Sequence, residues 1–138
     1  MTDAELVRKK LAFILQCVRE LETMADPARI ATDIREERFV VHTLQLAIQA
    51  ALDVAFHILA DEGLGEPRSN REAFEILARH GKLPPAHAAT MERMAGFRNI
   101  VVHGYETVDL RIVRDVLEHR LGDLVSFVRD VECLLGEG

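Results

Sequence analysis

The chain has 138 residues, of which 49% are hydrophobic and 29% charged. A chain of this size and composition buries enough apolar surface to form one globular domain, here expected over residues 1–138, without disulfides or a structural metal. The net charge of −6 at pH 7 argues against a protein that binds nucleic acid over its whole surface, because phosphate contacts dominate such binding. The negative net charge does not exclude a small basic cleft.

The first residues lack the positive start and apolar block of a signal peptide, and no uninterrupted run of 18 apolar residues occurs. We therefore expect a cytoplasmic protein without a membrane partner. The two cysteines, Cys17 and Cys133, lie within apolar helical patterns at opposite ends of the chain. Two reduced core thiols are the expected state, and a disulfide joining the two ends is the alternative.

The first predicted helix covers about residues 3–25, with Asp3 as its N-cap. Asp26-Pro27 ends it, because the residue before a proline is driven out of the α region. Apolar residues three and four apart define its buried face: Val7, Leu11, Ile14, Val18 and Leu21.

A second helix is predicted from Asp33 to Glu62, where Asp33 and Glu36 resemble a capping box. Gly63 is expected to end it. Its apolar positions are dense and include Leu46, Val54 and Ile58. So wide an apolar stripe predicts burial on two sides, one of them against another subunit.

A clearer capping box, Ser69-Asn70-Arg71-Glu72, opens a short helix that ends at His80-Gly81. Pro84-Pro85 begins a fourth helix, in the position where proline is tolerated. This helix runs into the segment Arg98–Tyr105, and Gly104 is expected to bend or break the chain there.

One last helix is predicted over about residues 109–135, with Asp109 as its N-cap. No alternating strand pattern of useful length is present. The sequence therefore predicts an all-α, up-and-down bundle of four long helices and one short helix.

The segment Arg98–Tyr105 carries residues suited to RNA chemistry. RNA is cleaved when its 2′-hydroxyl attacks the adjacent phosphate, which needs a base, a stabilising cation and help for the leaving oxygen. His103 can act as base or acid near neutral pH, and Arg98 offers a cationic fork for phosphate oxygens. The nucleophile is already in the substrate, so we expect no metal and no cofactor.

Five residues on a regular helix correspond to about 500°, which places Arg98 and His103 roughly 140° apart around the axis. The two side chains converge only if the helix distorts before Gly104, or if a symmetric partner supplies half of each site. The wide apolar stripe of the second helix favours the dimer.

Arg98, Asn99, His103 and Tyr105 together resemble the motif of the HEPN superfamily, and within it the HepT toxins, whose hallmark is Arg, a polar residue, three further residues, His, one residue and Tyr. The resemblance extends to the helical context and to the upstream block 46–58. It covers most of the chain.

The resemblance implies a homodimeric ribonuclease toxin that acts on tRNA or mRNA and not on DNA. Arg98 and His103 would be catalytic, with Asn99 in support. The implied partner is an MntA-like nucleotidyltransferase antitoxin that transfers AMP to Tyr105. Bulk and negative charge beside a phosphate site would block it.

Each residue also has an ordinary interpretation. His103 is otherwise a packed or helix-end histidine, Arg98 a surface ion-pair residue, Asn99 a helix cap and Tyr105 a packing residue. Two alternatives to a ribonuclease follow: a non-catalytic, substrate-binding partner of a nucleotidyltransferase, and a purely structural helical dimer.

Asp53 and His57 share a face of the second helix, four residues apart. We interpret them as an ion pair or hydrogen-bonded pair rather than a metal site. The other histidines show no metal-binding spacing.

Overall fold

The computed structural model describes residues 3–103 and 108–137, without the side chains of residues 102, 103 and 137. Every regular element in this part of the chain is a helix, which confirms the all-α prediction. In chain order the elements are α1 (Ala4–Met24), the 3-10 turn η1 (Pro27–Arg29), α2 (Ile34–Glu62), α3 (Asn70–Arg79), α4 (Pro85–His103), α5 (Leu110–His119), α6 (Leu121–Glu132) and the π-helical turn η3 (Cys133–Glu137).

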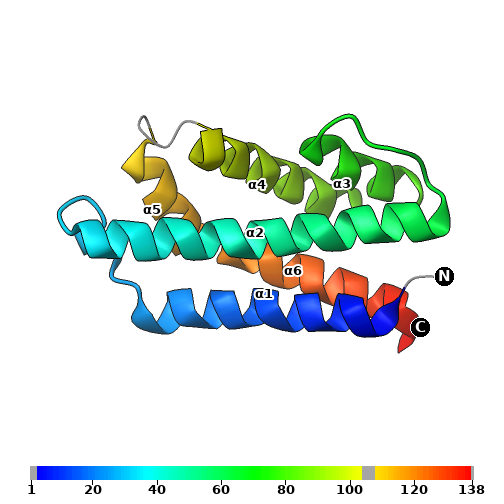
Figure 1. Cartoon of the computed structure of the whole chain (residues 1–138), viewed down its shortest axis with the longest axis horizontal. Coiled ribbons are helices and arrows are strands. Elements are labelled where there is room, and N and C mark those ends of the chain that lie inside the picture. Colours follow the sequence, from blue (N-terminus) through cyan, green and yellow to red (C-terminus); the bar gives the residue numbers. More distant parts are fainter. Residues whose placement is uncertain (1–2, 104–107, 138) are drawn as a thin grey trace.

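Helix α2 runs the length of the molecule and organises the bundle (Figure 1). It packs against α1 on one side, against α3 and α4 on the other, and against α6 behind. All five apolar residues predicted for the buried face of α1 are buried. The rings of Phe74 on α3 and Phe127 on α6 meet edge to face, with centroids 5.7 Å apart. Such a contact adds about 0.5–1.5 kcal/mol to the burial of the two rings.

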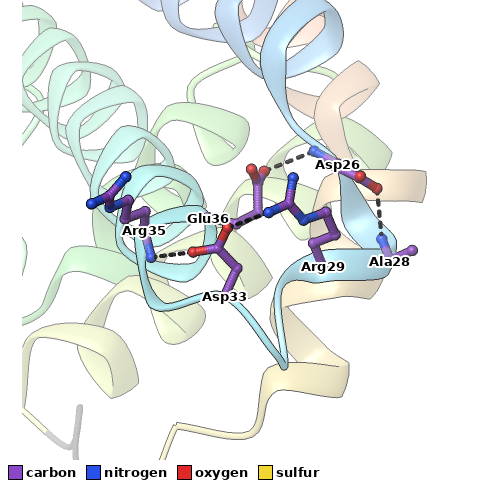
Figure 2. Close-up of polar contacts among 6 residues, drawn as sticks. All are labelled: Asp26, Ala28, Arg29, Asp33, Arg35 and Glu36. Atoms are coloured by element: carbon purple, nitrogen blue, oxygen red, sulfur yellow. Dashed lines mark hydrogen bonds and ion pairs between the residues drawn. The ribbon is translucent and has the colours of Figure 1, made fainter.

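The connection between α1 and α2 is fixed by side chains that accept backbone hydrogen bonds (Figure 2). Asp33 caps α2 by accepting from the Arg35 N–H at 2.9 Å, and its other carboxylate oxygen pairs with Arg29 at 2.7 Å. Glu36 reaches past Asp33 to the Asp26 N–H at 2.7 Å. Helix α2 therefore starts as predicted. Glu36 does not complete the expected capping box but instead accepts a hydrogen bond from the preceding turn, at Asp26.

The prediction of one last helix is wrong, because the chain turns at Arg120 and forms α5 and α6 (Figure 1). Arg120 has φ −119° and ψ −1°, outside regular helical geometry, and α6 begins without a side-chain cap. Apolar residues keep their helical spacing across the turn. Val116 and Leu117 before it, and Leu121 and Leu124 after it, are all buried. Hydrophobic period alone therefore cannot reveal this break.

Helix α2 is long and apolar enough, by length and composition alone, to cross a membrane, but 56% of its most apolar window is buried inside the bundle. A core helix passes the same test. Of the residues that suggested burial on a second side, Val54 and Ile58 are already covered within one chain, whereas Leu46 stays 39% exposed. The stripe available to a partner is narrower than predicted.

Both cysteines are free thiols, but their surroundings differ. Cys17 is buried, as expected for a core thiol. Cys133 is exposed, so the prediction of a second core thiol is wrong. It follows α6 directly and lies off the buried face formed by Val128 and Val131.

Candidate functional site

Helix α4 carries the first part of the segment singled out in the sequence. Its inner face is anchored by Met91, Met94, Ala95, Phe97 and Val101, all buried. The helix continues without a break to His103, so Arg98 and Asn99 lie in its last turns. Successive residues on a helix point about 100° apart, and the neighbours of these two side chains differ accordingly.

Arg98 faces α2 and is half-buried. Its Nη2 donates a hydrogen bond to Gln49 Oε1 at 2.5 Å. Its Nε is fully buried and has no hydrogen-bond partner among the described residues. Arg98 is therefore held by a neutral amide, and the surface ion pair offered as its ordinary role does not occur within the described part of the chain.

The acceptor for Arg98 is itself part of a line of polar contacts across α2. Gln49 Nε2 donates to Asp53 Oδ1 at 2.8 Å. Asp53 Oδ2 lies 3.3 Å from Lys10 Nζ on α1, with both side chains about 40% exposed. We call Lys10, Asp53, Gln49 and Arg98 the arginine network.

Asn99 faces α3 instead. Its Oδ1 accepts a hydrogen bond from Asn70 Nδ2 at 3.3 Å. Asn70 is the first residue of α3, directly after the N-cap Ser69, whose Oγ accepts from the Glu72 N–H at 3.1 Å. Asn99 thus ties the end of α4 to the start of α3, and not to Arg98.

His103 is the last residue of α4. Its side chain and the whole of Tyr105 lie outside the described residues. The backbone bears on one of the two ways in which the side chains could converge: α4 is helical up to His103, so the expected break does not occur before that residue. On a regular helix the two positions are roughly 140° apart.

The interpretation of Asp53 and His57 as a pair is wrong. Asp53 is engaged by Lys10 and Gln49. His57 Nε2 lies 3.2 Å from Asp61 Oδ2 one turn later, although its angle is not that of a hydrogen bond. The described residues contain no cluster of three or more His, Cys, Asp or Glu side chains that could hold a metal.

Helix α5, which follows the motif along the chain, begins at a side-chain cap. Asp109 accepts from the Arg111 N–H at 2.9 Å, as predicted for an N-cap, and its carboxylate also receives Arg111 Nε and Nη2 at 3.1 and 2.9 Å. The Arg111 side-chain hydrogen bonds, and then its backbone hydrogen bond, lower the pKa of Asp109 below its ordinary value. The start of α5 is therefore stabilised by an ionised carboxylate.

The surface along the first half of α2 is concave. A hollow of about 720 Å³ is lined there by Arg38, Phe39, Val41, His42 and by Val108, which precedes α5. A smaller groove of about 350 Å³ lies between α1 and α2, where Leu6, Phe13 and Leu46 are exposed beside Gln49 and Asp53. The outer face of α2 thus combines apolar side chains with the arginine network.

Comparison with known proteins identifies relatives of this chain. It is 30% identical over 125 residues to an mRNA nuclease HepT of Shewanella oneidensis, covering 90% of this chain and 94% of the relative. It is 34% identical over 92 residues to a tRNA nuclease HepT of Aphanizomenon flos-aquae, covering 67% and 63%.

A solved structure of the Shewanella oneidensis HEPN toxin, tri-AMPylated and in complex with an MNT antitoxin, superposes with a TM-score of 0.86. The identity is 30%, and the match covers 96% of this chain and 99% of the toxin. Residues 14–131 match the Ribonuclease HepT-like family, and together with these relatives this match establishes that the chain belongs to that family.

Proposed function

We propose that this chain is a metal-independent ribonuclease and the toxin of a toxin–antitoxin pair. The observation that carries the proposal is the placement of Arg98, Asn99 and His103 on the last turns of α4, in a chain of the HepT-like family whose relatives are named as RNA nucleases. Because those relatives are an mRNA nuclease and a tRNA nuclease, the substrate class is RNA of either kind.

The proposed reaction uses the RNA itself as nucleophile. His103 accepts the proton of a 2′-hydroxyl while that oxygen attacks the adjacent phosphorus. The bond from phosphorus to the 5′-oxygen then breaks, which leaves a 2′,3′-cyclic phosphate and a protonated 5′-hydroxyl. Arg98 stabilises the charge that builds on the phosphate oxygens. General acid–base help of this kind is worth about 10²–10⁴-fold in rate.

A homodimer is part of the proposal, because one regular helix cannot present both residues to one phosphate. A two-fold axis would place His103 of the partner subunit near Arg98, and the second imidazole would protonate the leaving oxygen. Leu6, Phe13 and Leu46 support this arrangement, since they leave apolar surface next to the arginine network.

We also propose that a nucleotidyltransferase antitoxin silences the site by modifying Tyr105. The phenol oxygen would attack the α-phosphorus of ATP, release pyrophosphate and form a tyrosyl–AMP phosphodiester. The AMPylated toxin–antitoxin complex of the relative supports this. Tyr105 is the one tyrosine of the chain, two residues from His103, so the added phosphate would compete with RNA phosphate for Arg98.

Cleavage of RNA in EDTA tests the proposal. Wild-type protein should cut RNA to products with cyclic phosphate ends, whereas Arg98→Ala and His103→Ala should lose at least about 10²-fold in rate. Arg93→Ala changes an exposed arginine on the same helix and should remain active. Binding of nucleotide without any cleavage would instead support the non-catalytic partner of a nucleotidyltransferase, and a fully active His103→Ala would contradict the assigned mechanism.

A further inference from the structure

Gln49 is the one neutral member of the arginine network, and its amide has no freedom of orientation. Its oxygen faces the Arg98 guanidinium, which can only donate hydrogen bonds, and its nitrogen faces the Asp53 carboxylate, which can only accept. Rotating the amide by 180° would set donor against donor and acceptor against acceptor. The charged neighbours therefore fix which end of Gln49 meets Arg98.

Asp53 is fixed in its turn. One carboxylate oxygen receives Gln49 Nε2 at 2.8 Å and the other receives Lys10 Nζ at 3.3 Å. The network thus spans three helices, from α1 through α2 to α4. Hydrogen bonds to an ionised group are about twice as strong as those between neutral groups, so both ends of the Gln49 amide are held by strong bonds.

The neutral amide at position 49 also leaves the positive charge of Arg98 uncompensated. A carboxylate at position 49 would form an ion pair and neutralise the guanidinium. Here the carboxylate is that of Asp53, four residues further along α2, and it is paired with Lys10. The four residues carry two positive charges and one negative charge, so the network retains a net charge of one cation at the end of α4.

We propose that Gln49, held by Asp53 and Lys10, is a positioning residue that fixes the Arg98 guanidinium for phosphate without neutralising it. This inference rests on the proposed ribonuclease function. Misplacing a group that acts in the transition state lowers kcat with little change in KM. A merely structural link between α2 and α4 would instead lower the melting temperature and leave kcat alone.

The test compares three full-length variants with wild type. Gln49→Ala removes the acceptor for Arg98. The double change Gln49→Glu with Asp53→Asn exchanges carboxylate and amide, so that an acceptor still faces Arg98 and the total charge is unchanged. Gln16→Ala is the matched control, since Gln16 is an exposed glutamine that bonds only to Glu20 on its own helix among the described residues.

Two readouts are measured on each protein. Steady-state cleavage of a fluorogenic RNA oligonucleotide in EDTA gives kcat and KM. Hydrogen exchange of the buried Arg98 Nε–H, observed in protein with ¹⁵N-labelled arginine and assigned by its loss in Arg98→Lys, reports the order of the guanidinium without reference to any activity.

We expect Gln49→Ala to lower kcat by about tenfold with KM within about twofold, and to speed exchange of the Arg98 Nε–H. The double variant should recover protection of the Arg98 Nε–H but not kcat, because a carboxylate at position 49 orders the guanidinium and also neutralises it. Gln16→Ala should match wild type. Unchanged kcat in Gln49→Ala, or a double variant that fails to restore protection of the Arg98 Nε–H, would overturn the positioning role. Full recovery of kcat in the double variant would overturn the requirement for a neutral partner at position 49. An inactive wild type would overturn the ribonuclease proposal itself. The failure of the two proposals can be distinguished, because the exchange measurement reports whether Gln49 orders Arg98 even in an inactive protein.

Discussion

Asn70 on α3 donates a hydrogen bond of 3.3 Å to Asn99 on α4, so the two consecutive residues Arg98 and Asn99 are held by different helices. Arg98 is tied to α2 and Asn99 to α3. The end of α4 is therefore held by hydrogen bonds to two helices. The Asn70–Asn99 bond can be tested separately from the arginine network.

Replacing Asn70 by Ala should weaken the link between α3 and α4. We expect Asn70→Ala and Asn99→Ala each to lower the free energy of unfolding by about 1 kcal/mol, the usual worth of one hydrogen bond. The double variant should lose less than the sum, because both single changes remove the same bond. Urea unfolding of the three variants measures this coupling, and strictly additive losses would show that the Asn70–Asn99 bond contributes nothing.

Replacing Asp33 by Ala should destabilise the start of α2. The change removes both the cap to the Arg35 N–H and the ion pair with Arg29 (Figure 2). We expect a loss of about 1–2 kcal/mol, mostly from the cap. Thr32→Ala, one residue earlier at an exposed position, is the control. Equal denaturant midpoints for the two variants would refute the assignment of Asp33 as the cap.

The two thiols should react at very different rates. Burial, and then the charge of Glu20, raise the pKa of Cys17, so little thiolate is present there near neutral pH. Cys133 is exposed. A chromogenic disulfide reagent should therefore modify one thiol quickly in the native protein and both in urea. Cys133→Ser should abolish the fast phase, and a fast phase that survives this change would place the reactive thiol at Cys17.

Acid should weaken the start of α5. Because Arg111 lowers the pKa of Asp109 in the folded protein, the carboxylate stabilises the fold above its ordinary pKa of 3.8, and this contribution is lost as the pH falls through the lower, folded value. Asp109→Asn should thus reduce the melting temperature near pH 7. The difference from wild type should shrink steadily on acidification below 3.8. A difference that is independent of pH would mean that the charge of Asp109 plays no part.

The sequence predicts the helices well where local signals are strong. The spacing of Val7, Leu11 and Ile14 gives the buried face of α1, and Gly63, with φ 62°, ends α2 in the left-handed conformation that favours glycine. The turn at Arg120 is different, because the apolar period continues across it. Gly122, a poor helix former just beyond the turn, is the one local signal that pointed to it.

The arginine network shows why the site was only partly predictable. Gln49 and Asp53 are four residues apart on one helix, a spacing that favours a hydrogen bond, and this signal was missed because Asp53 was paired with His57. That Arg98 reaches Gln49 depends on how α4 packs on α2, which no local pattern in the sequence encodes. The roles of His103 and Tyr105 remain predictions from the family resemblance.

The turn at Arg120 separates two helices that are packed independently. It divides the C-terminal arm into two separately docked pieces: α5, held by Val113, Val116 and Leu117, and α6, which lies against α1, α2 and α4. The junction between them has no side-chain cap. We expect a bulky, charged group added just ahead of α5, such as an AMP phosphodiester, to disturb the packing of α5 first. Because α6 has its own contacts with α1, α2 and α4, the packing beyond Arg120 should be less affected.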